Sequence, residues 1–208
     1  MNINQTILRT NVLLISFTVS FAGVISAQGK KTPSVKPQED GGTVYAASDL
    51  ASSTPLARPA DVASPEALLA ALHDSVSGPQ GPVDWDRFRS LFLPSARLGS
   101  TRTDVNGVTR ITSSTVEELI SSGAAEREKV PWYEEILVKH LERFDHIAVA
   151  FYSHDDRSSL QGPPIQQSVN VCVMLYDGSR WWIQSASWEA VPKFRSLPPE
   201  LDPRVHTR

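Results

Sequence analysis

Three β-strand patterns near the end of the chain constrain the fold more than any other feature. The segments HIAVAFYS (146–153), IQQSVNVCVMLY (165–176) and RWWIQSASWEAV (180–191) are rich in aromatic and β-branched residues, which favour strands. Asp177-Gly178 joins the last two, and this dipeptide is typical of a tight hairpin turn. The pattern therefore predicts a run of antiparallel strands.

Helical patterns come before these strands. Ser64 can cap free backbone N–H groups, Pro65 suits the first helical position, and Glu66 favours the positive end of the helix dipole. Apolar residues then recur at helical spacing as far as Val76, and a shorter amphipathic pattern follows in DWDRFRSLF (84–92). Helices followed by strands predict an α+β domain with helices on one face of a curved antiparallel sheet.

One segment, WYEEILVKHLERFD (132–145), is compatible with two structures. Its apolar residues recur at helical spacing, so periodicity alone favours a helix. Several of them also share one face of a strand, with charged residues between them. The residues by themselves leave both structures open.

Residues 1–27 are typical of a secretory signal. Arg9 precedes an apolar run that starts at Val12 and ends in the small residues Ser26 and Ala27. Polar residues interrupt this run, which falls short of the roughly 20 residues that a membrane-spanning helix needs. We therefore expect export to the periplasm or the medium, with no membrane attachment after processing.

Composition divides the remaining chain into three parts. Residues 28–63 are dominated by Pro, Ser, Gly and Ala, which predicts a disordered spacer. Residues 193–208 contain LPPELDPR and predict a flexible tail. The intervening residues 64–192 have the length of one ordinary domain with one core.

Charge and cysteine content exclude several classes of protein. Removal of residues 1–27 takes away Arg9 and no acid, which leaves 19 basic and 23 acidic residues and a net charge of −4. A mildly acidic chain lacks the basic patch that nucleic acid needs. Cys172 is the single cysteine, so no intramolecular disulfide can form, and its apolar strand predicts an inert, small hydrophobic side chain.

Three motifs together resemble the bacterial exported branch of the nuclear transport factor 2-like superfamily. They are GPVDWDRFRSLF, ERFDHIAVAFYSHDDR and VNVCVMLYDGSRWWIQSASW, and the resemblance covers residues 64–192 in order. It implies a cone, in which a strongly bent antiparallel sheet wraps around N-terminal helices and leaves a pocket at its open end. It also implies that residues 132–144 are mainly strand. The chain departs from the family pattern at Asp145, where a glycine is common, and at residues 166–168, which lack an expected Arg-Gly.

The resemblance also suggests where chemistry would occur. Ketosteroid isomerases, scytalone dehydratases and polyketide cyclases of this superfamily place an acid or a histidine inside the cone, where burial tunes its pKa. The candidates here are Glu134 and His140, which strand alternation places on one face, and more weakly Glu135, His154 and Asp155. The competing interpretation is that these charges lie on an exposed or dimer-facing side. We expect SHDDR, from residue 153 to 157, to be a solvated turn.

Alternation along the last two strands predicts a pocket wall. Even-numbered residues from 170 to 176 and from 182 to 188 should share the concave side of the sheet. Two indoles, a methionine and a few polar groups would make a mostly apolar wall, as ligand pockets have. The predicted pocket residues are Trp85, Tyr152, Asn170, Met174, Trp182, Gln184 and Trp188.

Other site chemistries find no support in the sequence. The five histidines show no H-x-H or H-E-x-x-H spacing, so we expect no metal site. The chain contains no G-x-S-x-G, no G-x-G-x-x-G and no phosphate-binding loop. We therefore expect neither a nucleotide cofactor nor a nucleophilic serine.

Two functional hypotheses remain, and the missing acid–base motif and the tryptophan-rich wall favour the first, which is non-catalytic. In the first, the exported domain binds an apolar small molecule, or pairs with a protein partner such as a second copy through its sheet, without catalysis. In the second, it is a cofactor-independent lyase or isomerase with Glu134 or His140 as general base. Either residue lying inside the cone within hydrogen-bond distance of Tyr133, Tyr152 or Asn170 would favour the second hypothesis.

The signal pattern makes a direct prediction about the mature chain. Signal peptidase should cleave after Ala27, so the exported protein should begin at Gln28. N-terminal sequencing of protein recovered from the periplasm or the medium measures this. A chain that still begins at Met1 would remove the prediction of export.

Overall fold

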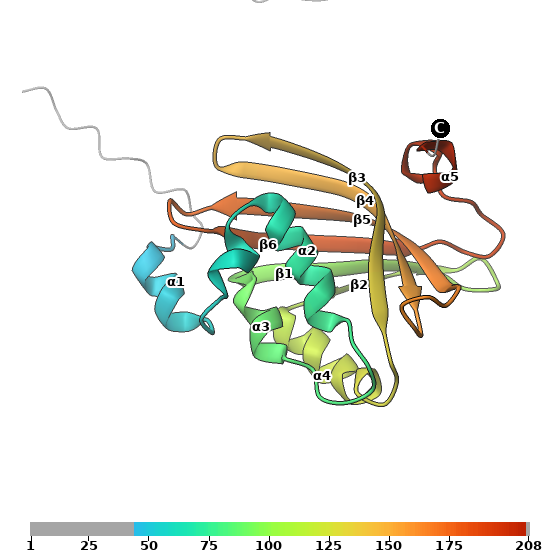
Figure 1. Cartoon of the computed structure of the whole chain (residues 1–208), viewed down its shortest axis with the longest axis horizontal. Helices are drawn as coiled ribbons and strands as arrows, with labels where there is room; N and C mark the ends of the chain where they lie inside the picture. Colours follow the sequence, from blue (N-terminus) through green and yellow to red (C-terminus); the bar gives the residue numbers. More distant parts are fainter. Residues whose placement is uncertain (1–43, 207–208) are drawn as a thin grey trace, which may run out of the picture. The chain divides into compact units, whose positions relative to one another are not determined.

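A six-stranded sheet with the strand order β2-β1-β6-β5-β4-β3 organises the computed structural model, which describes residues 44–206 (Figure 1). All neighbouring strands pair antiparallel except β1 and β6, which pair parallel. The predicted α+β class with a curved, antiparallel sheet is confirmed, with this one parallel pair as an addition. The strands are β1 (Phe92–Thr103), β2 (Thr109–Ser114), β3 (Tyr133–Phe144), β4 (Ile147–Arg157), β5 (Pro164–Tyr176) and β6 (Trp181–Ala190).

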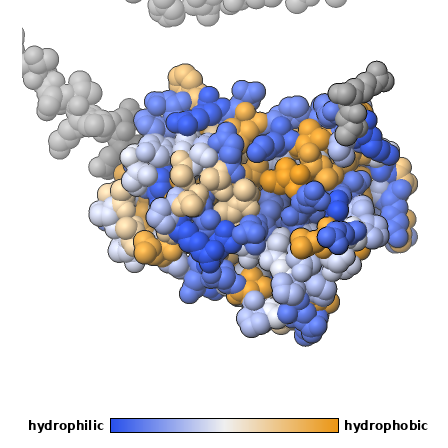
Figure 2. Space-filling model, in the orientation of Figure 1, coloured by the Kyte–Doolittle hydropathy of each residue, from blue (hydrophilic) through white to orange (hydrophobic). Residues whose placement is uncertain are grey.

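Helices α2 and α3 lie across one face of the sheet (Figure 1). The hydroxyl of Ser64 accepts the N–H of Ala67, which confirms the predicted start of α2. Hydrophilic side chains gather over α3 on the side away from the sheet (Figure 2), whereas Phe88 packs inward. The helices are α1 (Ala47–Ser53), η1 (Pro59–Val62), α2 (Pro65–Val76), α3 (Trp85–Ser90), α4 (Val116–Arg127), η2 (Pro199–Leu201) and α5 (Pro203–His206).

The ambiguous segment at residues 132–145 forms β3, an edge strand of the sheet, as the resemblance implied. Ile136 pairs with His154 and Val138 pairs with the next residue along, Ser153, so Leu137 is an extra residue in a bulge. Compared with unbroken alternation, the bulge places every later side chain of β3 on the opposite face of the sheet. Because of it, Glu134 faces α2 while His140 faces away, and the prediction that both share a face is wrong.

A second irregularity changes the faces of β6. Met174 pairs with Ile183 and its neighbour Val173 pairs with Ser185, which leaves Gln184 as the extra residue, and its side chain is exposed. Ile183 thus shares the inner face with Met174, while Trp182 pairs with Leu175 on the other face. The prediction that Trp182 and Gln184 line the concave wall is therefore wrong.

The hydrophobic core is larger at both ends than composition predicted. Leu50 of α1 and Val62 of η1 are buried in it, so residues 44–63 are not a disordered spacer, and residues 28–43 lie outside the described residues. Leu197 and Leu201 are buried as well, so residues 193–206 are not a free tail. In both segments, a few isolated apolar side chains are enough to pack the chain against the rest of the domain.

The C-terminal segment is fixed to the sheet by polar contacts too. The hydroxyl of Ser153 donates to the carbonyl of Leu201 over 2.7 Å, and His140 Nε2 lies 2.9 Å from the carbonyl oxygen of Glu200. The segment around η2 therefore covers the outer face of β3 and β4. Among the described residues, no helix is long and apolar enough to cross a membrane.

The docked C-terminal segment can be tested by truncating one side chain. Leu201→Ala should lower the free energy of unfolding by about 2–5 kcal/mol, because it leaves a cavity in a fully buried site. Val205→Ala, at a half-exposed position nearby, is the matched control and should change little. Urea melts measure both, and equal small losses would contradict the docking.

Candidate functional site

A cluster of polar side chains is buried between α2 and the inner face of β3, β4 and β5. His73 enters from the last turn of α2, and Glu134 lies at the start of β3, directly opposite Asp156 of β4. Alternation along β4 places Tyr152 and His154 on the same inner face. Asn170 pairs with Tyr152 from β5 and completes the cluster.

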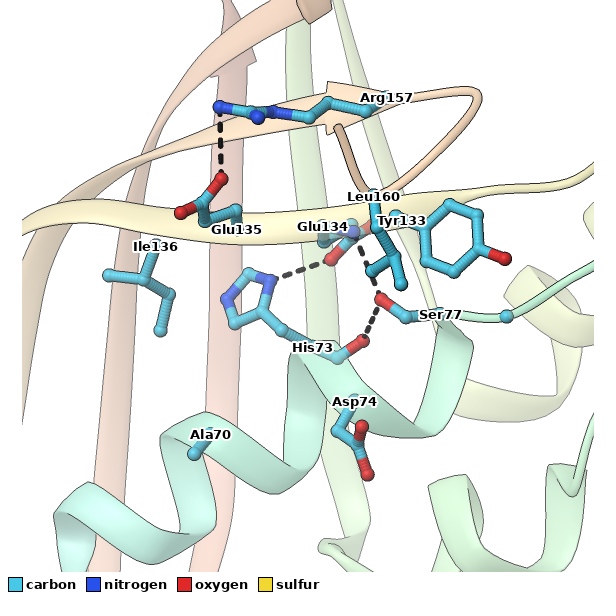
Figure 3. A pocket seen from close by; sticks show the side chains of 11 residues that line it. Ala70, His73, Asp74, Ser77, Tyr133, Glu134, Glu135, Ile136, Arg157 and Leu160 are labelled. Atoms are coloured by element: carbon cyan, nitrogen blue, oxygen red, sulfur yellow. Dashed lines mark hydrogen bonds and ion pairs between the residues drawn. The ribbon is translucent and has the colours of Figure 1, made fainter. Parts of the chain in front are cut away.

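His73 joins two of these groups (Figure 3 shows its contact with Glu134). His73 Nδ1 lies 2.6 Å from Glu134 Oε2, and because an ionised carboxylate only accepts, the imidazole carries a proton on Nδ1. His73 Nε2 lies 3.0 Å from the hydroxyl oxygen of Tyr152. The indole N–H of Trp132 donates to Glu134 Oε1 over 3.0 Å. The carboxylate is thus held at both oxygens.

A second histidine–carboxylate pair lies beside the first. His154 Nε2 is 2.9 Å from Asp156 Oδ1, and His154 Nδ1 is 2.9 Å from Asn170 Nδ2. The rings of His73 and His154 meet edge to face with centroids 4.9 Å apart. Two histidine–carboxylate dyads therefore stand side by side in a region that excludes most water.

Burial and pairing act against each other on the pKa values of the cluster. Burial alone would raise the pKa of Glu134, but the hydrogen bond and charge of His73 outweigh it, so this pKa is lowered. Burial opposes the charged form of His154, yet the hydrogen bond to Asp156 and the charge of Glu134 raise its pKa. Burial raises the pKa of Asp156 and holds that of Tyr152 well above its usual value. Glu134 is therefore the carboxylate that stays ionised most readily.

The same cluster offers donor atoms of the kind that metals take. Glu134, His154 and Asp156 each place one such atom within 4.8 Å of the other two. These atoms also serve the hydrogen bonds just described.

A pocket of about 610 Å³ opens onto the first dyad (Figure 3). His73 and Glu134 are the members of the cluster that line it, while Tyr152 and the second dyad lie behind them. Side chains from the end of α2, the start of β3 and the β4–β5 connection form the wall. The lining residues are Ala70, His73, Asp74, Ser77, Gly78, Tyr133, Glu134, Glu135, Ile136, Arg157 and Leu160.

The candidate acid–base residues from the sequence have different positions in the structure. Glu134 lies in the site, Glu135 lies at the pocket rim in an ion pair with Arg157, and His140 lies on the outer face. His154 and Asp155 are buried within β4, so the prediction that SHDDR is a solvated turn is wrong. A turn was predicted because charged residues are rarely buried, but here each has a partner.

The predicted wall residues are divided among several places. Tyr152, Asn170 and Met174 are buried on the inner face. Trp188 lies with Asn170 along a smaller hollow of about 250 Å³. The indole N–H of Trp85 donates to Glu128, away from the pocket described above.

His73 is the residue that the sequence interpretation missed. It lies on the buried face of α2, four residues after Leu69 and one after Leu72, both of which are core residues. A histidine within an apolar helical stripe was the available signal. Its partner Glu134 lies 61 positions away in sequence, so no local motif joins the two.

Comparisons with known proteins give matches among solved structures, each at low sequence identity. No protein-family model matches the chain, and no curated protein matches it. Among solved structures, it is similar to a protein of unknown function with a cystatin-like fold from Nostoc punctiforme. That match has 12% identity and a TM-score of 0.47, and it covers 61% of this chain and 87% of that one.

Two further solved structures carry descriptions of an activity. One is a candidate dehydratase of the nuclear transport factor 2-like family from Streptomyces avermitilis, with 15% identity, a TM-score of 0.47, and coverage of 64% of this chain and 96% of that one. The other is a candidate ketosteroid isomerase from Parabacteroides distasonis, with 15% identity, a TM-score of 0.41, and coverage of 63% and 90%. Proteins of the superfamily that the sequence motifs resemble are thus among the similar structures.

The raised pKa of His154 predicts how the protein responds to pH. A histidine whose folded pKa lies above its unfolded value of 6.5 stabilises the fold below that pH, and this stability is lost as pH rises through the folded pKa. The free energy of unfolding should therefore fall on the alkaline side of about pH 6.5. Urea melts across this range measure it, with His140→Asn as a control that keeps the slope.

An NMR titration of the His154 ring tests the same prediction without a variant at a buried site. Its midpoint should lie above the ordinary histidine value, because Asp156 and Glu134 favour the protonated ring. A midpoint below that value would show that the effect of burial on the pKa outweighs that of the two carboxylates. The free energy of unfolding would then rise with pH in this range instead of falling.

Proposed function

We propose that this protein is a small-molecule lyase or isomerase in which Glu134 and His73 perform acid–base catalysis. The observation that carries the proposal is the 2.6 Å contact between these two groups at the wall of a pocket. Tyr152 supports the imidazole from behind, at 3.0 Å. A carboxylate, an imidazole and a phenol in one hydrogen-bonded line can accept, hold and return a proton.

The geometry assigns a role to each group. Glu134 stays ionised and lines the pocket, so it can take a proton from a carbon or a hydroxyl group of a bound molecule. His73 Nδ1 donates its proton in a hydrogen bond to the carboxylate and so orients it and favours its ionised form, and Tyr152 holds the ring in the orientation this needs. Return of the proton to another atom of the same molecule gives an isomerisation, and return to a departing hydroxyl gives a dehydration.

Burial supports catalysis over binding alone. An apolar ligand needs no ionisable groups, and burying two carboxylates and two histidines costs free energy unless they pair. Such paired groups with shifted pKa values beside a pocket are typical of catalytic sites. The non-catalytic hypothesis, in which the pocket binds an apolar molecule, fits Ala70, Ile136 and Leu160 but leaves the polar cluster without a role.

Deuterium exchange tests the proposal without a known substrate. Wild-type protein in D₂O should catalyse incorporation of deuterium beside the carbonyl of some members of a panel of cyclic enones and hydroxyketones, read by NMR. Glu134→Gln should lower the exchange rate by roughly 10²–10⁴-fold, because it removes the base. His73→Gln should lower it as well, because it removes the donor that orients the carboxylate and favours its ionised form.

Two control variants make the outcome specific. Glu142→Gln alters an exposed carboxylate of β3 outside the pocket lining, and His140→Gln alters the histidine on the outer face. Both should retain the exchange rate within a few-fold. If Glu134→Gln exchanges as fast as wild type, the protein is a binding module and the catalytic proposal fails.

A second copy of the chain is the partner that we propose for the outer face of the sheet. Ile147, Val149 and Phe151 of β4 and Val171 of β5 form a partly exposed apolar stripe there. Large apolar stripes on a sheet favour association. Export also remains our proposal, supported by the signal pattern at residues 1–27, which lie outside the described residues.

A further inference from the structure

The charges around the pocket are unbalanced. Two arginines serve four carboxylates: Arg157 pairs with both Glu135 and Asp155, and Arg87 pairs with both Asp74 and Asp61. Each arginine therefore leaves one negative charge without compensation. Figure 3 shows Asp74 and Glu135 on different sides of the pocket, so the negative charge is not confined to one point.

The first dyad and the nearest other cation do not remove this excess. A protonated His73 would balance Glu134 and nothing more. Arg127 lies beside Gly78, but its guanidinium donates to the backbone carbonyls of Val76, Gly78 and Val130. Asp61 shares Arg87 with Asp74, so the pocket and its ion-pair network hold five carboxylates: Asp61, Asp74, Glu134, Glu135 and Asp155. Even with a protonated His73 and Arg127 included, only four cations face them, which leaves a net charge of −1.

Two carboxylates of the lining remain available to a ligand. Asp74 uses Oδ2 for Arg87 and Glu135 uses Oε2 for Arg157. The second oxygen of each has no partner among residues 44–206, and both side chains are more than half exposed. A donor on a bound molecule could therefore reach an ionised oxygen from the pocket.

The rest of the lining is suited to an apolar body. Ala70 of α2, Ile136 of β3 and Leu160 of the β4–β5 connection contribute aliphatic surface. The ring of Tyr133 is also part of the lining (Figure 3) and can attract a cation over its face. A volume of about 610 Å³ is within the range of small-molecule sites.

We propose that the ligand of this pocket is an organic cation, a primary or secondary ammonium group carried on an apolar body. This rests on the proposed function for the identity of the site, and it names the class of substrate that the site would select. The ammonium group would contact Asp74 or Glu135 at the rim. The apolar body would lie against Tyr133 and Leu160, with its reactive atom toward Glu134.

Three probes that share a benzyl group test the proposal: phenethylammonium, 2-phenylethanol and phenylacetate. Calorimetric titration of the full mature chain at neutral pH should rank their affinities as ammonium, then alcohol, then carboxylate. The ammonium should bind about fivefold more tightly than the alcohol at low salt, as exposed ion pairs contribute up to about 1 kcal/mol. The ratio should shrink between about 0.01 M and about 1 M salt, because the Debye length falls from about 30 Å to about 3 Å.

Substitutions test whether Asp74 and Glu135 cause the preference for the ammonium probe. Asp74→Asn combined with Glu135→Gln should bring the ratio of ammonium to alcohol affinity close to one and leave alcohol binding unchanged. Glu66→Gln, an exposed acid at the other end of α2, is the matched control and should keep the wild-type ratio. Both sets of changes lie on the surface, so thermal melts should show an intact fold.

The outcomes separate this inference from the proposed function. Equal affinities for the three probes, or tightest binding of phenylacetate, would overturn the cationic class and leave the exchange chemistry of Glu134 and His73 untouched. Failure of all three probes to bind overturns the cationic class as well. A preserved ammonium preference in Glu134→Gln, together with unchanged deuterium exchange, would support the ligand class while the catalytic proposal fails.

Discussion

The contact between His73 and Glu134 depends on how the end of α2 is joined to the edge strand β3. The backbones of Gly78 and Trp132 exchange two hydrogen bonds, of 2.7 and 2.9 Å. The hydroxyl of Ser77 accepts the N–H of Glu134 and donates to the carbonyl of His73. These bonds fix the end of α2 against the start of β3. They therefore hold the imidazole of His73 and the carboxylate of Glu134 in position for their contact. The pocket, which both elements line, and the proposed chemistry depend on this junction.

Much of the fold could be predicted from the sequence, because it depends on patterns among neighbouring residues. Strand propensity, the Asp177-Gly178 turn and the Ser64 cap are properties of neighbouring residues, and each was confirmed. The edge strand β3 needed the family resemblance, since periodicity alone favoured a helix. The docked ends were missed because composition describes a segment on average, whereas single residues such as Leu50 and Leu201 decide whether it packs.

The candidate site could be predicted only in part, and the reason is geometric. Glu134 was identified, but strand alternation wrongly placed His140 on the same face and Gln184 on the pocket wall. Each error follows from one inserted residue in a bulge, and a bulge has no signature in side-chain periodicity. His73 was missed because its role arises from contacts with strands far along the chain. A site depends on contacts between residues far apart in sequence, and such contacts are the hardest to predict from a single sequence.

The bulge at Leu137 has an evolutionary consequence. If Leu137 instead paired with His154, the bulge would disappear, and the first four residues of β3 would shift by one position along β4 and exchange faces. The carboxylate presented to α2 would then give way to Tyr133 or Glu135. Because β3 has a neighbouring strand on one side only, such a shift would leave the pairing of the other strands unchanged. A one-residue shift of register at this edge is thus a short route by which one scaffold could acquire a different reaction centre.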